Sequence, residues 1–266
     1  MQKMKTIFIT GTSSGIGKET VKFLSKRDFR VIATARNIEK IKEFENLPNV
    51  IIMPLDITDT KQIKEISSKA IKEYDIDILF NNAGYGIKAP LELTPEEDIR
   101  KNFETVVIGN MLLTKEFIPH FKKRKSGMIL TTTSLAGIIA FPLDGVYGAA
   151  KRALTSMCES IYYELKPFNV KVKIIIPSAT QTDFKMQPFC IDGYEKASKN
   201  QYDFFIDGNT EFAKVSEIIE TIWEAINDNN DKIHYPAGKI ALKLYNQYIE
   251  MGIEKYKEFF YKKIFL

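Results

Sequence analysis

Short apolar segments rich in β-branched residues recur along the first two thirds of the chain, and each is followed by a turn and a helix-like segment. These apolar segments are predicted strands, at residues 6–10, 30–34, 50–53, 78–81, 128–133 and 170–176. Alternation of strands and helices indicates βαβ units, and near-continuous apolar strands are typical of a parallel sheet that is covered on both sides. The pattern therefore predicts an α/β fold, a doubly wound, Rossmann-like parallel sheet with helices on both faces.

The longest helical periodicity lies at residues 95–125 and 146–167. Beyond the last of these strands the pattern is irregular until a helix predicted at 215–227, a short strand at 233–236 and a final helical segment from Lys239. No Pro/Gly/Ser-rich linker, low-complexity tract or internal repeat interrupts the sequence. We therefore expect residues 1–266 to form a single domain.

The charge balance argues against a nucleic-acid partner. The 266 residues include 38 Lys and Arg and 34 Asp and Glu, so the formal net charge is +4, and the two signs are interleaved. A nucleic-acid-binding protein would concentrate its basic residues on one face. The short basic cluster at residues 122–125 is instead typical of a helix end, where cations complement exposed carbonyl groups.

Cysteine and histidine usage excludes further classes of protein. Cys158 and Cys190 are too few and too far apart for a disulfide framework or a zinc site. His120 and His234 have no metal-ligand spacing, so we expect no metal. The apolar stretch 7–9 is far shorter than a signal-peptide core, and no stretch approaches the roughly 20 apolar residues of a membrane-spanning helix. These features predict a cytoplasmic protein.

A glycine-rich loop follows the first predicted strand. Glycines let the backbone turn sharply and approach a pyrophosphate, and the free N–H groups of the next helix point toward its negative charge. Three glycines also mark ordinary tight turns, but the order of strand, loop and helix near the N-terminus favours binding of a dinucleotide. The residues expected to contact the cofactor here are Gly11, Ser13, Ser14, Gly15, Ile16 and Gly17, with the spacing GxxxGxG.

The end of the second predicted strand bears on which dinucleotide is bound. A fold that prefers NAD normally offers a carboxylate to the ribose hydroxyls at this place, and here the chain has Ala35 and Arg36. Ala35 leaves room for a 2′-phosphate and Arg36 can pair with it, so NADP is favoured over NAD. The alternative is that Arg36 is a solvated surface residue. After the third strand, Asp56 is a candidate acceptor for the adenine amino group, although Asp-x-Thr also begins helices.

The strongest chemical feature is the pair Tyr147 and Lys151 near the start of a long helical segment. Residues four apart share a helix face, so we expect the Lys151 ammonium beside the Tyr147 phenol, where it would lower the pKa of the phenol. Ser134 follows the predicted strand 128–133, at the edge of the sheet where α/β folds bind ligands, and its hydroxyl can hold a carbonyl oxygen. Tyr-x-x-x-Lys alone is commonplace, but with Ser134 and the glycine loop it predicts a general acid–base site.

With these residues in place, the chain resembles the classical short-chain dehydrogenase/reductase family over about its first 185 residues. The loop at 10–17 is similar to the cofactor loop of the family, and residues 81–84 are similar to its NNAG motif. Ser134, Tyr147 and Lys151 match three members of its catalytic tetrad. The cofactor contacts that this resemblance implies, beyond the glycine loop and Arg36, are Asp56, Asn82, Ala83, Gly84, Tyr147, Lys151, Pro177 and Thr182.

Three residues bear on how the chain departs from the family pattern. Val106 stands where the family has a catalytic Asn, which helps to position a water that leads protons toward the lysine. Asn110, one helical turn further on, either substitutes in part or is a polar residue at a subunit interface or in solvent. Ser178 replaces the glycine of the family's PGxxxT element. The proton relay is therefore not assured, whereas Tyr147 and Lys151 are not directly affected.

The resemblance implies hydride transfer between a nicotinamide and a carbonyl or alcohol carbon. In reduction, Ser134 would bind the carbonyl oxygen, Tyr147 would protonate it, and Lys151 would lower the pKa of Tyr147 and hold the nicotinamide ribose. With NADP favoured, we expect reduction to be the cellular direction. The alternative from another class is a cofactor-binding regulator or scaffold with the same fold and weak turnover, prompted by Val106 and Ser178.

The resemblance also indicates where the substrate and partners are selected. In the family the segment after the sixth strand selects the substrate, so we expect residues 184–210 to be the substrate loop. The aromatic and apolar side chains of this loop favour a hydrophobic ketone or aldehyde as the substrate. The alternative is that they simply pack in the core. The side chains that carry the prediction are Phe184, Met186, Phe189, Tyr194, Tyr202, Phe204 and Phe205.

The C-terminal segment, residues 239–266, is expected to form a lid or an interface. Its last part, 254–266, interleaves apolar residues with lysines, a pattern that is also found in helices lying on anionic membranes, and we favour this membrane alternative less. The helical segments 95–125 and 146–167 resemble the pair through which family members form homodimers or homotetramers.

Overall fold

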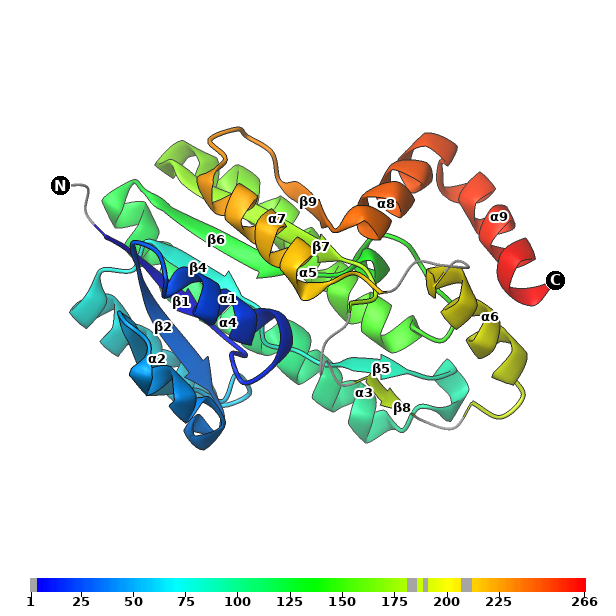
Figure 1. The fold of residues 1–266 in the computed structure, drawn as a ribbon, viewed down its shortest axis with the longest axis horizontal. Coiled ribbons are helices and arrows are strands. Elements are labelled where there is room, and N and C mark those ends of the chain that lie inside the picture. The colour runs from blue at the N-terminus through cyan, green and yellow to red at the C-terminus, as the bar shows by residue number, and fades with distance from the viewer. Residues whose placement is uncertain (1–3, 181–185, 189–190, 207–211) are drawn as a thin grey trace.

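The computed structural model describes residues 4–180, 186–188, 191–206 and 212–266. Within these residues seven strands form one sheet, paired in parallel throughout, in the order β3-β2-β1-β4-β6-β7-β9 (Figure 1). The predicted doubly wound parallel sheet is confirmed, and the predicted short strand near residue 234 is β9. The strands are β1 (Lys5–Ile9), β2 (Phe29–Ala35), β3 (Val50–Pro54), β4 (Ile78–Asn81), β6 (Gly127–Thr132), β7 (Val170–Pro177) and β9 (His234–Ala237).

Helices cover both faces of the sheet. Neighbouring residues of β1 show the two sides, because Phe8 belongs to one hydrophobic core and Ile7 and Ile9 belong to the other. The first core is closed by α2 (Thr60–Tyr74), α4 (Gly109–Arg124) and α5 (Gly145–Leu165). The second is closed by α1 (Gly15–Leu24), the 3-10 helix Ile38–Asn46 and α7 (Val215–Asn227). The strand order reverses between β1 and β4, which places a ligand-binding crevice at their carboxyl ends.

The segment predicted as one helix at 95–125 is interrupted. The helix α3 (Glu96–Phe103) leads into a π-helical stretch, Glu104–Ile108, and only then into α4. A π-helical stretch inserts an extra residue into the turn and displaces the ordinary i→i−4 bonds, and such stretches are frequent at functional sites. The apolar periodicity does not reveal this interruption, since both sides of it remain helical.

The C-terminal segment forms two helices that pack beside a helix of the predicted substrate loop. The final predicted helical segment is divided at Gly252, whose φ is +73°, into α8 (Lys239–Met251) and α9 (Ile253–Phe265). The sequence pattern did not predict α6 (Glu195–Ile206), which lies next to α9 (Figure 1). The apolar face of α9 is buried within the fold through Tyr256, Phe260 and Ile264.

A second, two-stranded parallel sheet brings together β5 (Gly86–Lys88) and β8 (Met186–Pro188). Each strand has three residues, which is too short to produce a recognisable alternation, and the sequence pattern predicted neither. The pairing ties the segment after β4 to the segment after β7. Among the residues described here, no helix has the length and apolar character needed to cross a membrane.

Candidate active site

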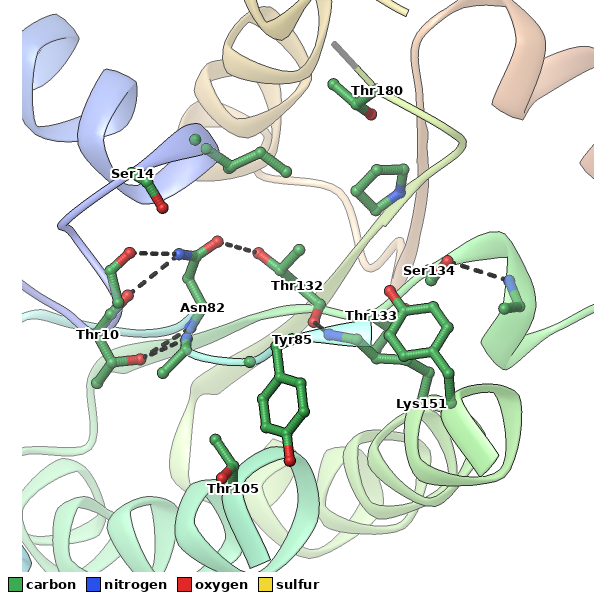
Figure 2. A pocket seen from close by; sticks show the side chains of 18 of the residues that line it. Thr10, Ser14, Asn82, Tyr85, Thr105, Thr132, Thr133, Ser134, Lys151 and Thr180 are labelled. Carbon is green, nitrogen blue, oxygen red and sulfur yellow. Dashed lines mark hydrogen bonds between the residues drawn. The ribbon is translucent and has the colours of Figure 1, made fainter. Parts of the chain in front are cut away.

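A cavity of about 1090 Å³ lies at the carboxyl ends of the central strands. Figure 2 shows the glycine-loop residue Ser14 on one side of it and Ser134 with Lys151 on the other. Gly17 and Asp56 are not in its wall, and Thr182 lies outside the residues that the structure describes. The predicted site residues that do line the cavity are Gly11, Ser13, Ser14, Gly15, Ile16, Arg36, Asn82, Ala83, Gly84, Ser134, Tyr147, Lys151 and Pro177.

The loop after β1 has a conformation that requires glycine. Gly11 has a φ of +69°, and a Cβ at this position would lie 2.7 Å from the Cα of Ala83. A Cβ at Gly17 would collide with the Gly11 carbonyl and the Asn82 amide, so Gly17 lets α1 approach the loop. Ser14 is the N-cap of α1 but makes no side-chain capping bond, which leaves the first N–H groups of the helix for another acceptor.

Asn82 connects three strands at the carboxyl edge of the sheet. Its Nδ2 donates to the carbonyls of Thr10 and Gly11, at 3.2 and 3.3 Å, and the Thr132 hydroxyl donates to its Oδ1 at 3.1 Å (Figure 2). The Thr10 hydroxyl accepts the backbone N–H groups of Asn82 and Ala83, at 2.9 and 3.0 Å. These bonds fix the segment after β4 against the glycine loop.

Two cations stand at the rim beyond β2. Arg36 and Lys40 are both exposed and both line the cavity, whereas Ala35 is buried. Lys40 is not among the predicted site residues; it lies four residues after Arg36, in the 3-10 helix Ile38–Asn46. In the sequence, only the four-residue spacing between Arg36 and Lys40 suggests that the two side chains point to the same side.

The wall after β3 is formed by Leu55, Ile57 and Thr58. Asp56 lies between them in sequence, and its Oδ1 accepts the backbone N–H and the hydroxyl of Thr58, at 2.9 and 2.7 Å. The Asx-type turn that Asp-x-Thr can form is therefore present, and the structure places Asp56 beside the cavity wall.

Ser134, Tyr147 and Lys151 meet in one wall of the cavity. Ser134 begins the short 3-10 helix Leu135–Gly137, where its Oγ accepts the backbone N–H of Ala136 at 3.2 Å, and its hydroxyl also hydrogen-bonds the Tyr147 side chain. Tyr147 and Lys151 lie one turn apart on α5, with the Lys151 Nζ 5.9 Å from the centre of the tyrosine ring. The Nζ atom is oriented by a bond to the Thr132 carbonyl at 2.9 Å.

Burial shifts the pKa of both titratable groups. Desolvation raises the pKa of Tyr147 above its ordinary value; hydrogen bonding to Ser134 opposes this, and the charge of Asp144 adds to it. Desolvation also lowers the pKa of Lys151 to about 8. The net direction is therefore opposite to the lowered pKa that the sequence predicts for Tyr147, because loss of hydration is the largest influence on the phenol in this structure.

The segment after β7 forms another part of the wall through Pro177, Ser178 and Thr180. The Thr180 hydroxyl donates to the Ser178 carbonyl at 2.7 Å, which shapes the turn. The Ser178 hydroxyl is buried and has no hydrogen-bond partner among the residues that the structure describes. Buried hydroxyls are nearly always bonded, so this one is a candidate contact for a ligand.

Aromatic side chains gather at one end of the cavity. Of the predicted pocket residues, Tyr202 and Phe205 line it, whereas Phe204 packs against Phe260, with the ring centres 4.9 Å apart. Tyr194 is also outside the wall, and its hydroxyl donates to Glu92 at 2.7 Å. Phe184 and Phe189 lie outside the described residues, as does the side chain of Met186. The aromatic residues that line the cavity are Tyr85, Phe141, Tyr147, Tyr202, Phe205 and Phe212.

A model of the short chain dehydrogenases matches residues 5–189. An uncharacterized oxidoreductase of Schizosaccharomyces pombe is 33% identical over 212 residues, which span 78% of this chain and 90% of that protein. The chain belongs to the short-chain dehydrogenase family. The resemblance seen in the sequence is confirmed, and with it the class of enzyme, an oxidoreductase that acts on alcohols or carbonyl compounds with NAD(P).

Other short-chain dehydrogenases extend the comparison. A 3-ketodihydrosphingosine reductase of Bacteroides thetaiotaomicron is 34% identical over 179 residues, which span 67% of this chain and 65% of that protein. A short-chain dehydrogenase from Streptomyces avermitilis has a TM-score of 0.85 at 23% identity, over 99% of this chain and 98% of the other. ElxO with NADP bound has a TM-score of 0.75 at 26% identity, over 87% and 95% of the two chains. A relative from Burkholderia phymatum in complex with NAD has a TM-score of 0.77 at 20% identity, over 94% and 96%.

The position of the usual short-chain dehydrogenase Asn is filled here by an apolar side chain. Val106 is fully buried and lies close to the Lys151 amine, since a Cβ at Gly84 would be 3.5 Å from Val106 Cγ2 and 3.8 Å from Lys151 Nζ. An isopropyl group neither donates nor accepts a hydrogen bond. A water held by this side chain is therefore excluded.

In this short-chain dehydrogenase the Asn110 side chain bonds the backbone where the helix is interrupted. It is 1% exposed, so its interpretation as an interface or solvent residue is wrong. Its Nδ2 donates to the carbonyls of Val106, Ala83 and Thr105, at 2.9, 3.2 and 3.3 Å. Asn110 thus joins the π-helical stretch to the segment after β4.

Proposed function

We propose that the protein is an NADP-dependent reductase of hydrophobic ketones or aldehydes. The observation that carries the proposal is that Ser134, Tyr147 and Lys151 meet in the wall of a cavity that also contains the glycine loop and Arg36. A regulator or scaffold that only bound the cofactor would need the loop, but it would have no use for a buried phenol beside a serine hydroxyl. We therefore favour the enzyme over the binding protein.

The residues of the cavity fit a nicotinamide dinucleotide. The close approach of Gly11 to Ala83 and the uncapped start of α1 suit a pyrophosphate, and the unpartnered Ser178 hydroxyl suits a polar group of the nicotinamide end. Pro177 would lie beside the same end, with Thr182 as a further proposed contact. When bound, the reduced cofactor supplies the hydride.

The preference for NADP rests on the rim beyond β2. Arg36 and Lys40 would pair with a 2′-phosphate through charge-assisted bonds, and the buried Ala35 leaves room for it. ElxO, which is 26% identical, has a structure with NADP bound, and this supports the choice. Asp56 remains a proposed contact for the adenine through the carboxylate oxygen that does not bond Thr58.

The chemistry of reduction follows from the charges that develop. As the carbonyl carbon accepts a hydride, its oxygen gains negative charge, and the Ser134 hydroxyl donates a hydrogen bond to that oxygen. The Tyr147 phenol transfers its proton to the oxygen and the product is the alcohol. Burial raises the pKa of Tyr147, so the phenol holds its proton at neutral pH, which is the form that reduction requires.

Lys151 supports this proton transfer through its charge. Its ammonium, held by the Thr132 carbonyl, stabilises the phenolate that remains on Tyr147 after the transfer. Its remaining N–H groups would hold the nicotinamide ribose. Because the Val106 side chain cannot hold a water, we propose that Tyr147 is reprotonated through the open mouth of the cavity.

The substrate is proposed to be hydrophobic because aromatic side chains surround its end of the cavity. Phe141, Phe205 and Phe212 belong to separate segments that converge there. One relative is named as a 3-ketodihydrosphingosine reductase, which supports a ketone as the reacting group. Phe205 is carried by α6, which lies beside α9 at one end of the molecule (Figure 1).

We also propose that the protein is a homo-oligomer that pairs through α4 and α5. An apolar groove runs between these helices, lined by Met111, Ile118, Met157 and Ile161 among others. Light scattering after size exclusion measures the state directly. A mass of a dimer or tetramer that falls to one chain in Met157→Glu supports the pairing, and a monomeric wild type contradicts it.

The function is tested by following NADPH and NADH consumption with a panel of aldehydes, steroids, quinones and ketoacyl compounds. Wild type should turn over with a preference for NADPH, and Tyr147→Phe should lose at least about 1000-fold in kcat because no general acid remains. Tyr163→Phe is the matched control, since Tyr163 lies on the same helix and is 74% exposed. Tight NADPH binding without any turnover would support the regulator, and turnover that survives in Tyr147→Phe would overturn the assignment of Tyr147.

A further inference from the structure

Three polar side chains line the substrate end of the cavity without a part in the proposed proton and hydride transfer. They are Lys88 at the end of β5, Asp144 just before α5, and Gln201 on α6. Each belongs to a different segment, and none was singled out by the sequence. A ketone with plain hydrocarbon chains would offer no group for these polar side chains to bind.

A backbone bond places Lys88 beside Asp144. The N–H of Ala89 donates to the carbonyl of Leu143 at 2.8 Å, so the residues that precede Ala89 and follow Leu143 come together on the cavity wall. Within the described part of the chain, no ion pair within 4.0 Å joins the Lys88 amine to the Asp144 carboxylate, although their charges interact. The two groups are neighbours without neutralising each other by direct contact.

Asp144 has an oxygen without a partner. Its Oδ1 is buried and accepts no hydrogen bond from the residues that the structure describes. Asp144 is the N-cap of α5, but its side chain makes no capping bond, so the carboxyl group does not serve the helix. It lies three residues before Tyr147, about one helical turn along α5, and its charge acts on the Tyr147 phenol.

Gln201 presents a second acceptor from the opposite element. It is 1% exposed, and its Oε1 is buried with no hydrogen-bond partner in the described ranges. Gln201 and Phe205 are four residues apart and share one face of α6, and the Phe205 ring packs on Phe141 with centres 5.2 Å apart. Because Phe141 lies just before Asp144 in sequence, this face of α6 covers the Asp144 segment.

Two buried acceptors that face one cavity without partners call for a ligand that donates hydrogen bonds, since a buried polar group left unbonded is costly. A hydroxyl or a protonated amine is such a donor, whereas a carboxylate or an ether is not. The Lys88 charge keeps the neighbouring carboxyl closer to its ionised form, which is the stronger acceptor. Lys88 is thus a positioning residue for Asp144.

We propose that Asp144 and Gln201, supported by Lys88, bind a second polar group of the substrate, so that the preferred substrates are hydrophobic ketones carrying a hydroxyl or protonated amine a few bonds from the carbonyl. This proposal rests on the proposed reductase function. Desolvation raises the pKa of Asp144 to about 7, in agreement with a carboxyl group that lacks a partner until a donor is bound.

The test compares three ketones of equal chain length: an alkyl ketone, its β-hydroxy counterpart and its β-amino counterpart. For wild type, kcat/KM should be at least about tenfold higher for one or both polar ketones than for the alkyl ketone. In Asp144→Leu and Gln201→Leu this ratio should fall toward one, while the Kd for NADPH stays unchanged. Asp203→Leu is the matched control, because Asp203 lies on the exposed side of α6.

A binding measurement separates this inference from the reductase function. Calorimetry of each ketone with the protein saturated with NADP+ reports a complex in which the carbonyl cannot be reduced, provided that the β-hydroxyl group is placed on a tertiary carbon so that NADP+ cannot oxidise it, and the same order of affinities is expected there. A wild type that binds the three ketones equally overturns the proposal, as does a polar preference that persists in both Asp144→Leu and Gln201→Leu. If no ketone is reduced, the proposed function fails. The affinities measured with NADP+ still show whether the cavity recognises the polar group.

Discussion

Asn110 donates a hydrogen bond from its side-chain amide to the carbonyl oxygen of Val106, 2.9 Å away and one turn earlier in the chain. The π-helical stretch Glu104–Ile108 displaces the usual helix bonds here, and the same amide reaches the carbonyls of Ala83 and Thr105. An amide nitrogen has two hydrogens to donate, so its donor capacity is used within this contact. The side-chain nitrogen of Asn110 therefore serves the backbone of the π-helical stretch and of the segment after β4.

This contact predicts that Asn110 stabilises the fold. Asn110→Leu leaves several buried carbonyl groups without a donor, so we expect the free energy of unfolding to fall by about 2–4 kcal/mol. Asn227→Leu is a matched control, because Asn227 also donates to a carbonyl four residues earlier, that of Trp223 at 2.8 Å, but at an exposed site. Its effect should be within about 0.5 kcal/mol of zero. Equal losses in the two variants by urea unfolding would contradict the role given to Asn110.

Arg36 and Lys40 are predicted to discriminate between the two cofactors. Each is exposed, so solvent weakens its pairing with a 2′-phosphate, and we expect Arg36→Ala and Lys40→Ala each to raise the Kd for NADPH by about tenfold. The Kd for NADH should not change, because NADH lacks the phosphate. Lys42→Ala is the control on the same 3-10 helix, since Lys42 is exposed and lies outside the cavity wall. Parallel losses for both cofactors in fluorescence titrations would show that Arg36 and Lys40 do not read the phosphate.

The sequence predicts those parts of the site that depend on local spacing. The Gly11 turn needs a positive φ, and Tyr147 and Lys151 share a helix face because they are four residues apart. These relations follow from backbone geometry alone, as did the alternation of strands and helices that defines the sheet. Boundaries were also near their observed positions, since the helix predicted at 215–227 is α7 with the same ends.

Relations between distant segments could not be predicted in this way. Lys88 and Asp144 are 56 residues apart and meet because Ala89 bonds Leu143 through the backbone, which no side-chain pattern records. The π-helical stretch keeps the apolar spacing of an ordinary helix, so the change in the backbone bonds around Val106 left no trace in the sequence. The rise in the pKa of Tyr147 likewise depends on how fully the fold desolvates the phenol.

Alcohol oxidation should accelerate with pH. In this direction Tyr147 accepts a proton and must first be ionised, and its pKa is raised by desolvation, so the rate should rise by about tenfold per unit up to about pH 8 and level off above it, where Lys151 loses the charge that stabilises the phenolate. Reduction uses the protonated phenol, so the rate of reduction should not rise over this pH range. It should instead decline above about pH 8 as the Lys151 amine, whose pKa burial lowers to about 8, loses its charge. A flat profile for oxidation by NADP+ would count against Tyr147 as the base.

Asp144 should make the protein less stable as pH rises. Desolvation raises its pKa from 3.8 to about 7, so the folded state holds the proton that the unfolded chain has already released. A raised pKa stabilises the fold below about pH 4, and this contribution is lost as pH rises through about 7. Asp144→Asn removes this dependence, so its stability relative to wild type should increase by about 2–3 kcal/mol between pH 5 and pH 8. Urea unfolding at these two pH values measures the difference, and an unchanged difference would show that the carboxyl is solvated.

Phe260 joins α9 to the substrate end of the cavity. Its ring packs on Phe141 at 5.3 Å and on Phe204 of α6 at 4.9 Å between centres. Phe260→Ala opens a void between α9 and α6, so we expect a loss of about 3–5 kcal/mol in stability and a several-fold higher KM for the ketone. The Kd for NADPH should not change, because the cofactor loops are distant from α9.

If α9 instead bound a membrane, its exposed residues and not the buried Phe260 would matter. Tyr261 is on the outer face of α9 and is 56% exposed, so Tyr261→Ala should leave the KM unchanged and would lower sedimentation with anionic vesicles only if α9 bound lipid. Because Tyr256, Phe260 and Ile264 are buried within the fold, the apolar face that a membrane would need is already occupied. We therefore expect neither the wild type nor either variant to sediment with vesicles, and strong sedimentation that is lost in Tyr261→Ala would overturn the assignment of α9 as a cover of α6.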